Sequence, residues 1–287
     1  MGHETRAYET TSISDADGLA VRFLYKTIPG RMLLSLLIRR PISRLAGALM
    51  DSRISRLMIR RFIKNNNIKM EDFLDVKYRS FNDFFVREVK AGLRSFPDQE
   101  SHVAAPCDGK LTAYKINADS VFYIKKSMYS VSELLKDSEL AAKFIDGICL
   151  IFRLSPDDYH RYSFIDDGEI LHQKEIKGKL HTVRPISQER DNVYAQNARD
   201  YTLIRTSNFG DVVQMEIGAL FVGRIVNHDN GKIVKRGEEK GMFQFGGSSV
   251  IMLFQKDTVI VDEVFFENTQ KDEETIVHMG SRIGYRM

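Results

Sequence analysis

The sequence predicts an α+β fold, in which a mixed or antiparallel β core, shaped as a barrel-like sandwich, follows a basic amphipathic helical region. In the C-terminal two thirds, short runs of β-branched and aromatic residues bounded by Gly, Asp and Asn succeed one another without long helical patterns between them. The first part of the chain instead combines many cations with apolar residues at helical spacing. With 287 residues, 43% of them hydrophobic, the chain has enough apolar content for one sizeable core and a smaller extension.

The N-terminal part is strongly basic. After a polar segment at residues 1–17, eleven Lys and Arg between Gly18 and Lys64 face a single acid, Asp51, so this stretch has a balance of +10 in a chain of net charge +3. Apolar residues recur at the spacing of one helix face within it. We therefore expect a pair of basic amphipathic helices within a membrane-associating region at residues 18–95.

Such helices suit an anionic lipid surface, because apolar side chains enter the interface and each cation near the surface contributes about 1 kcal/mol. A helical hairpin packed on its own catalytic domain is the alternative. Nucleic acid is not favoured as a partner, since no recognition motif accompanies the charge. No apolar stretch approaches the roughly 18 to 20 residues that a bilayer crossing requires. Only two cysteines, Cys107 and Cys149, and a polar start without a signal-peptide pattern lead us to expect a peripheral protein at the cytoplasmic face of the cell membrane.

Residues 96–287 are expected to form a β-rich catalytic domain. Ser80 has the position of a helix start, and Ser130 with Glu133 forms a capping box ahead of an apolar stretch that runs to Phe144. The predicted strands lie at residues 121–124, 148–154, 212–217, 220–226, 250–254 and 258–261.

The most informative motif is Gly246-Gly247-Ser248-Ser249, which a predicted buried strand follows directly. The two glycines let the backbone bend sharply enough for the Ser248 hydroxyl to approach the carbonyl just upstream. A serine in that position can cut its own chain. A polar turn that enters a strand is the alternative interpretation of the same residues.

This motif and three further blocks, in the same order, resemble the phosphatidylserine decarboxylase family, whose processing site is usually Gly-Ser-Thr or Gly-Ser-Ser. The resemblance covers roughly residues 78 to 284. The three blocks are Phe81-Asn82-Asp83-Phe84-Phe85-Val86-Arg87-Glu88, Pro106-Cys107-Asp108-Gly109-Lys110 and Asp158-Tyr159-His160-Arg161.

The resemblance implies a proenzyme that cuts itself between Gly247 and Ser248, giving a large chain, 1–247, and a small chain, 248–287, that stay associated. Attack by the Ser248 hydroxyl turns the amide into an ester, and elimination then leaves a pyruvoyl group at the new amino terminus. That group condenses with the amine of phosphatidylserine and draws electrons from the α-carbon as carbon dioxide leaves, which yields phosphatidylethanolamine. Neither pyridoxal phosphate nor a metal is expected.

The resemblance further implies Asp108, His160 and Ser248 as catalytic residues. Ser248 needs a base to attack the preceding carbonyl, and an imidazole oriented by an Asp is the usual activator. His160 is also expected to deliver the proton that replaces the carboxylate. The family's second His falls on Ser163 in this chain, so His181 supplies the missing imidazole, or His160 serves both steps, or the chain is processed slowly. If neither histidine serves, the chain stays whole and has no decarboxylase activity.

Other polar residues are less informative. Lys125 and Lys126 follow a predicted strand where the family often has a lysine, so they are candidates for contacting the substrate phosphate, and exposed strand-end lysines are the alternative. Glu216 alternates with apolar neighbours and is expected to face away from them, toward solvent or toward the site.

Two other functions stay open on the sequence. A membrane-surface serine hydrolase would use Ser248, His160 and Asp108 without cutting itself. A non-catalytic homologue would only bind anionic lipid. The sequence does not decide whether the chain forms a homo-oligomer.

Overall fold

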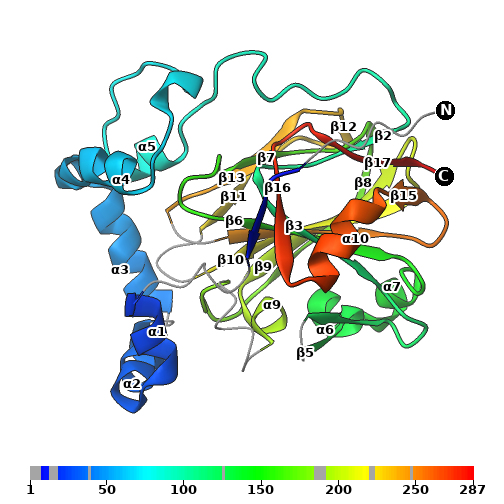
Figure 1. The fold of residues 1–287 in the computed structure, drawn as a ribbon, viewed down its shortest axis with the longest axis horizontal. Helices are drawn as coiled ribbons and strands as arrows, with labels where there is room; N and C mark the ends of the chain where they lie inside the picture. The colour runs from blue at the N-terminus through cyan, green and yellow to red at the C-terminus, as the bar shows by residue number, and fades with distance from the viewer. Residues whose placement is uncertain are drawn as a thin grey trace.

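The computed structural model describes residues 8–12, 19–37, 40–124, 127–183, 192–219, 224–245 and 248–287. They form the predicted α+β fold, with a body of antiparallel sheets and, along one side, a helical arm made by residues 19–65 (Figure 1). A long connection crosses from the arm to the body over the top of the molecule in that view.

The helices gather in the arm and around the body. The arm contains α1 (Leu19–Lys26), α2 (Ile28–Leu37), α3 (Arg40–Asp51), the 3-10 segment η2 (Arg53–Met58) and α4 (Ile59–Asn65), and is followed by η3 (Met70–Asp72) and α5 (Phe81–Phe85). Around the body lie α6 (Val131–Leu135), α7 (Ser138–Ala142), α9 (Val193–Gln196) and α10 (Glu263–Gln270).

A nine-stranded sheet with the order β1-β16-β3-β6-β14-β10-β9-β8-β12 forms the centre of the body, and each neighbouring pair is antiparallel. Its strands, in that order, are Thr10–Ser12, Glu273–Val277, Gly109–Lys115, Ile148–Leu154, Ser248–Phe254, Asp211–Gly218, Arg199–Thr206, Gly168–Ile176 and Ile233–Val234. Within the described residues the edge strands β1 and β12 do not pair with each other, so the sheet stays open and the barrel-like closure expected from the sequence does not form.

Three smaller sheets complete the body. They are β11-β13-β7 (Ile225–Asn227, Glu239–Phe243, Arg161–Ser163), β15-β17-β2 (Val259–Val261, Arg282–Arg286, His102–Ala104) and the hairpin β4-β5 (Val121–Ile124, Ser127–Ser130). Tyr162 of β7 and Phe243 of β13 join Phe152 of β6 and Val250 of β14 in one buried cluster. The sheet β11-β13-β7 therefore covers one face of the nine-stranded sheet, as in a sandwich.

Most predicted strands are confirmed. Five of them coincide with observed strands to within two residues at each end: 121–124 with β4, 148–154 with β6, 212–217 with β10, 250–254 with β14 and 258–261 with β15. The sixth, 220–226, overlaps β11 at its end, and residues 220–223 lie outside the described part.

Both predicted helix starts form. Ser80 and Ser130 each accept, through Oγ, a hydrogen bond from the backbone nitrogen three residues ahead, and they begin α5 and α6. The apolar stretch after Ser130 does not continue as one helix. Lys136 adopts left-handed backbone with φ of 50°, and Asp137 caps a second helix, α7. An αL residue ends a helix, which explains the break.

The helical arm contacts the body at two places. At one, the ring of Phe62 in α4 lies edge-on to that of Phe81 in α5, with 4.9 Å between the centroids. At the other, the Tyr25 hydroxyl of α1 lies 3.4 Å from Nδ1 of His181 and accepts a hydrogen bond from the backbone nitrogen of Thr182 at 3.1 Å. The arm is thus joined to a residue that the sequence marks as a site candidate.

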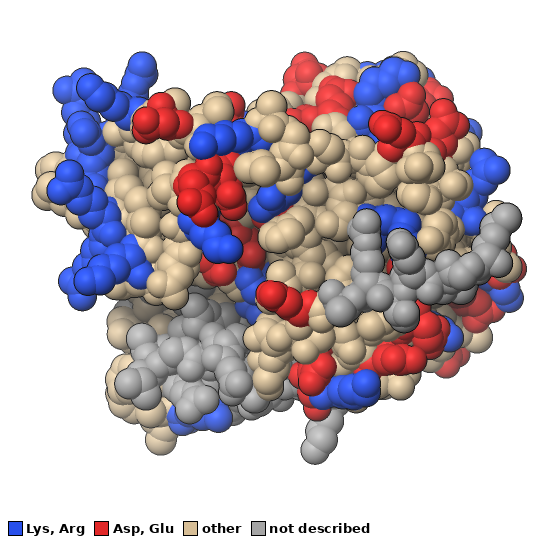
Figure 2. Space-filling model, turned by 45° about the horizontal axis from the view of Figure 1, so that its top comes forward, with Lys and Arg blue, Asp and Glu red and all other residues tan. Residues whose placement is uncertain are grey.

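Cations and apolar side chains share the outer surface of the arm. Figure 2 shows Lys and Arg side chains gathered along the edge of the molecule that the arm forms, at the left. Leu45 of α3, and Ile54 and Leu57 of η2, are 75%, 72% and 83% exposed. The exposed cations of the same stretch are Arg53, Arg56, Arg60, Arg61 and Lys64. Among the described residues, no helix has the length and apolar content needed to cross a bilayer.

Candidate active site

Ser248 is the first residue of β14, near the middle of the nine-stranded sheet. It lies opposite Gly218 of β10 on one side and opposite Leu154 of β6 on the other. The side chain is fully buried, and its hydroxyl has no hydrogen-bond partner among the described residues. Gly246 and Gly247 lie outside the described part. A buried hydroxyl without a partner costs free energy, so Ser248 is a candidate for a reacting group, and its place in the Gly-Ser motif is what distinguishes it from Ser249, whose hydroxyl also has no partner among the described residues.

His160 lies at the same end of the sandwich, directly before β7. Its carbonyl accepts a hydrogen bond from the nitrogen of Phe243 at 2.8 Å, and the chain reaches Ser248 five residues later. Because His160 follows a turn-prone stretch, 155–159, after the predicted strand 148–154, the sequence predicts that it lies at a strand end and faces a pocket. The strand end is observed, but the ring is fully buried and lies against Phe85, with 4.0 Å between the ring centroids.

The protonation of His160 follows from its contacts. Nδ1 lies 2.9 Å from the carbonyl oxygen of Asp158, and because a carbonyl only accepts, Nδ1 carries the hydrogen. Nε2 is then a lone-pair acceptor, and it has no partner among the described residues. Burial and the nearby charge of Arg87 lower the pKa of His160 to about 3. The ring is therefore neutral near pH 7, with its lone pair at Nε2.

Asp108, directly before β3, is held by several donors. Nε and Nη2 of Arg94 lie 2.7 Å from its two carboxylate oxygens, the backbone nitrogen of Met279 lies 2.8 Å away, and Nδ1 of His278 lies 3.4 Å away. Burial alone would raise the pKa of Asp108, but the hydrogen bonds from His278 and Arg94 and the charge of Arg94 outweigh it and lower that pKa to about 2. Asp108 is therefore ionised at neutral pH.

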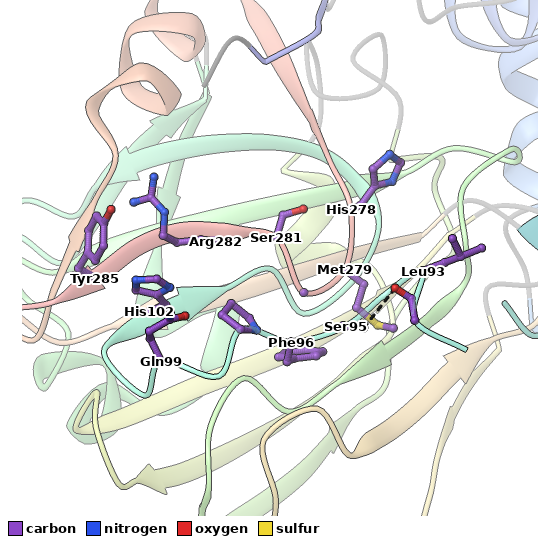
Figure 3. A pocket seen from close by; sticks show the side chains of 13 residues that line it. Leu93, Ser95, Phe96, Gln99, His102, His278, Met279, Ser281, Arg282 and Tyr285 are labelled. Atoms are coloured by element: carbon purple, nitrogen blue, oxygen red, sulfur yellow. Dashed lines mark hydrogen bonds between the residues drawn. The ribbon is translucent and has the colours of Figure 1, made fainter. Parts of the chain in front are cut away.

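His278 is a site residue that the sequence analysis missed. It lies in the turn between β16 and β17, where Gly280 has φ of 81° and packs so closely on Ser95 that a Cβ would lie 2.3 Å from its carbonyl oxygen. Figure 3 shows His278 beside Met279 at the border of an open pocket of about 880 Å³. No motif surrounds His278 in the sequence, so only its contact with Asp108 identifies it.

Asp108 and Ser248 lie at the same end of the sheet without touching. In the order β3-β6-β14 their strands are two positions apart, which corresponds to about 10 Å between backbones. Ser163, which stands where the family has its second His, lies on the Asp108 side: its nitrogen donates to the Pro106 carbonyl at 2.9 Å, and its Oγ lies 3.5 Å from Sδ of Met279.

His181 lies on the other side of β14, in a buried group with Asn197. The Asn197 side chain accepts from the backbone nitrogen of His181 at 3.0 Å and donates to its carbonyl at 2.8 Å. The same amide nitrogen also donates to the carbonyl of Gly218 at 2.8 Å. Because Gly218 is opposite Ser248, the segment that carries His181 is joined to the strand end that holds the candidate nucleophile.

A buried ion pair lies on the same face of the sheet as Ser248. Nζ of Lys240, from β13, lies 2.5 Å from Oε2 of Glu216, from β10, and 3.1 Å from Oδ1 of Asn227. Both charged side chains are at most 1% exposed. The sequence left open whether Glu216 faces solvent or the site. In the structure it is buried on the face that carries Ser248.

The paired lysines, the cysteines and the metal-ligating residue types complete the candidates. Lys125 and Lys126 lie outside the described residues. Cys107 and Cys149 are both buried and free. In the described part of the chain, no group of three or more His, Cys, Asp or Glu has the arrangement of a metal site.

Comparisons with known proteins agree with the motifs. The model of the family "Phosphatidylserine decarboxylase" matches residues 81–285. The chain is 46% identical to phosphatidylserine decarboxylase proenzyme 2 of Clostridium acetobutylicum, over 92% of this chain and 91% of that protein. It is 39% identical to the phosphatidylserine decarboxylase proenzyme of Clostridium novyi, over 93% of this chain and 92% of the other. It is 37% identical to the phosphatidylserine decarboxylase proenzyme of Ruminiclostridium cellulolyticum, over 98% of this chain and 95% of the other.

Proposed function

Because the chain belongs to the phosphatidylserine decarboxylase family, we propose that it removes the carboxylate of phosphatidylserine as carbon dioxide and releases phosphatidylethanolamine. It is then a carboxy-lyase made as a proenzyme. One observation carries the proposal: the buried hydroxyl of Ser248, without a partner in the described residues, begins a central strand within the family's processing motif.

Ser248 is the residue we assign to self-cleavage and to the pyruvoyl group. A residue at this position is held by hydrogen-bonded strands on both sides, so a new amino terminus formed here keeps its place after the cut. The absence of a hydrogen bond to Oγ, within the described residues, leaves that atom able to react. When formed, the pyruvoyl group supplies an electron-withdrawing carbonyl that accommodates the charge left as the carboxylate departs.

His160 is the residue we assign to proton transfer during decarboxylation. Its Nδ1 hydrogen is fixed on the Asp158 carbonyl, so Nε2 is the atom that exchanges protons. Nε2 relays a proton from the ammonium group of the substrate to the carbon that has lost its carboxylate, and with a pKa of about 3 the ring passes this proton on rather than keeping it. The buried contact with Phe85 keeps the ring in one orientation and excludes water from that face.

Asp108 and His181 act on the geometry of the site in this proposal. Asp108 is fully occupied by Arg94, Met279 and His278, so it fixes the turn between β16 and β17 against the start of β3. The Asn197 side chain joins the backbone of His181 to the Gly218 end of β10, and the His181 ring packs this segment near the Tyr25 hydroxyl. Both residues thereby support the strand ends on either side of Ser248.

The two chains that result from a cut before Ser248 stay associated in this proposal. The small chain, 248–287, would contain β14, whose seven residues pair with β6 on one side and with β10 on the other. It would also contain β16, which pairs with β3, and β17, which pairs with β2. Strands of the large chain therefore flank those of the small chain, and separation would break the sheet in its middle.

The helical arm is the part that we propose to contact the membrane surface, from the cytoplasmic side. Leu45, Ile54 and Leu57 offer apolar side chains to the interface, and the five exposed cations of η2 and α4 attract anionic headgroups. None of these five cations forms an ion pair among the described residues, so their charge is available to lipid. Through Tyr25 the arm also contacts the segment of His181, which brings the surface close to the site.

Intact mass spectrometry of the freshly purified protein, together with a carbon dioxide assay on phosphatidylserine vesicles, tests the proposal. We expect two chains, with a small chain of forty residues whose amino terminus carries the pyruvoyl group. A single uncut chain that releases carbon dioxide would overturn it. An uncut chain that hydrolyses esters, or only binds anionic vesicles, would instead support the serine hydrolase or the lipid-binding alternative.

A further inference from the structure

Glu216 and Ser248 share one face of the nine-stranded sheet. Glu216 lies directly opposite Val250, and Val250 is two residues after Ser248 on β14. Residues opposite each other, and residues two apart on a strand, point to the same side. Glu216 is therefore the diagonal neighbour of Ser248, with about 7 to 8 Å between Cα atoms, which a long side chain can bridge.

The carboxylate of Glu216 has one oxygen that is free to act. Oε2 is bound by Nζ of Lys240 at 2.5 Å, whereas Oε1 is buried and accepts no hydrogen bond of normal geometry in the described part of the chain, although the Asn227 side chain lies close enough to the carboxylate to lower the pKa of Glu216. The Ser248 hydroxyl, on the same face, is also buried and has no hydrogen-bond partner among the described residues. Two buried polar atoms without partners, an acceptor and a donor on adjacent strands, are each costly alone, and a small movement that brings them into a hydrogen bond would satisfy both and align them for proton transfer.

The other candidate bases are less suited to Ser248. Asp108 is two strands away, and Arg94, Met279 and His278 occupy its carboxylate. His160 is tightly packed on Phe85. The position of the family's second His carries the Ser163 hydroxyl here.

We propose that Glu216 is the general base of self-cleavage and that Lys240 holds it for this role. This inference rests on the proposed function. The proton of the Ser248 hydroxyl passes to Oε1 of Glu216 while Oγ bonds to the carbonyl carbon of the preceding residue. The carbon–nitrogen bond then breaks, the electron pair goes to the nitrogen of Ser248, and Glu216 returns its proton to that nitrogen. An amide becomes an ester without net gain or loss of atoms.

The surroundings of Glu216 suit a base at neutral pH. Burial raises the pKa of Glu216 to about 7, against the charge and hydrogen bond of Lys240, which lower it, while the charge of Asp200 raises it. The other titratable groups near this carboxylate are Tyr162 of β7 and Cys107, whose pKa values are raised mainly by burial and further by nearby carboxylates that include Glu216. A base is most effective when its pKa lies near the working pH, and about 7 fits better than the value of about 3 for His160.

Cell-free synthesis of the full chain, followed by timed denaturing gels, measures the rate at which the forty-residue fragment appears. In Glu216→Leu/Lys240→Met the buried pair is replaced by apolar side chains of similar size, which the fold usually tolerates. We expect this variant to melt cooperatively yet to cut about a hundredfold more slowly or worse. The matched control is Arg153→Met/Glu274→Leu, which removes another buried ion pair from the same sheet and should cut normally.

The pH dependence gives a second test that does not depend on the double variant. The wild-type rate should rise with pH through a midpoint near 7, because only the ionised carboxylate accepts the proton. In Lys240→Met the pKa of Glu216 rises further, so the midpoint should move to higher pH. Cutting of the double variant at the wild-type rate, or an unmoved midpoint in Lys240→Met, overturns the role of Glu216. A wild-type chain that never cuts overturns the proposed function instead.

Discussion

Arg94 and Asp108 form a two-pronged ion pair in which Nε and Nη2 each lie 2.7 Å from a different carboxylate oxygen. The pair joins the connection after the arm to the start of β3. Because both side chains are mostly buried, with side-chain exposures of 11% and 6%, the pair is shielded from solvent.

Asp108→Asn should lower the free energy of unfolding and remove a pH-dependent part of it. The folded-state pKa of Asp108, about 2, lies below its ordinary value, so its contribution is complete above pH ~4 and is lost as the pH falls through about 2. The contribution is on the order of 2 kcal/mol. Urea unfolding across this acid range measures it, with the exposed Asp98→Asn as control. If the free energy of unfolding falls equally with pH in Asp108→Asn and in wild type, Asp108 does not have the lowered pKa.

Ser248→Ala should leave the chain whole and abolish decarboxylation. Its neighbour provides the control, because Ser249 is equally buried and its hydroxyl also has no partner among the described residues, but it points to the opposite face of β14. We expect Ser249→Ala to be cut normally in an intact-mass measurement. If Ser248→Ala stays uncut and still decarboxylates phosphatidylserine, the mechanism through self-cleavage at Ser248 is wrong.

His160→Gln should separate the two reactions. If His160 transfers the proton in decarboxylation and Glu216 serves the cut, the variant is processed to two chains but releases carbon dioxide about a hundredfold more slowly or worse. Gel analysis and a carbon dioxide assay on the same preparation give both rates. Unchanged turnover in the variant would rule out this role of His160.

His181→Ala should slow self-cleavage, because it removes the buried imidazole whose Nδ1 lies 3.4 Å from the Tyr25 hydroxyl, and so loosens the segment whose backbone Asn197 joins to the Gly218 carbonyl opposite Ser248. The exposed His172→Ala on β8 is the control. The measurement is again the time course of fragment release. If His181→Ala is cut at the wild-type rate, the His181 side chain has no role in self-cleavage.

Leu57→Ser should weaken binding to anionic vesicles by about tenfold, since a leucine that enters the interface contributes more than 1 kcal/mol. Ile233→Ser, a similarly exposed apolar residue on β12 away from the arm, should bind as wild type does. Vesicle sedimentation measures both. Equal binding by the two variants would mean that the arm does not meet the membrane through η2.

The sequence was informative where local chemistry decides the structure. Strands β4 and β6 were predicted to the residue, because turn residues flank short β-branched runs, and Ser80 and Ser130 cap the helices that they were expected to start. The open sheet could not be foreseen, since whether β1 and β12 meet depends on how the whole sheet twists and pairs rather than on any single strand.

The candidate site could be predicted only in part, for a related reason. Ser248, His160 and Asp108 stand in motifs that can be recognised in the sequence. Glu216 and Lys240 are 24 positions apart, and they meet only because the sheet β11-β13-β7 covers the face of β10. The contact of His278 with Asp108 spans 170 positions and leaves no local trace in the sequence.

The central position of β14 has a consequence for how the protein unfolds and refolds after the cut. If the peptide before Ser248 is cut as we propose, the central strand of the sheet belongs to a separate forty-residue chain. Heat or denaturant would then release two chains that must meet again by diffusion, whereas the uncut polypeptide folds with all its strands tethered. We therefore expect the cut protein to owe its lifetime to slow unfolding rather than to reversible refolding.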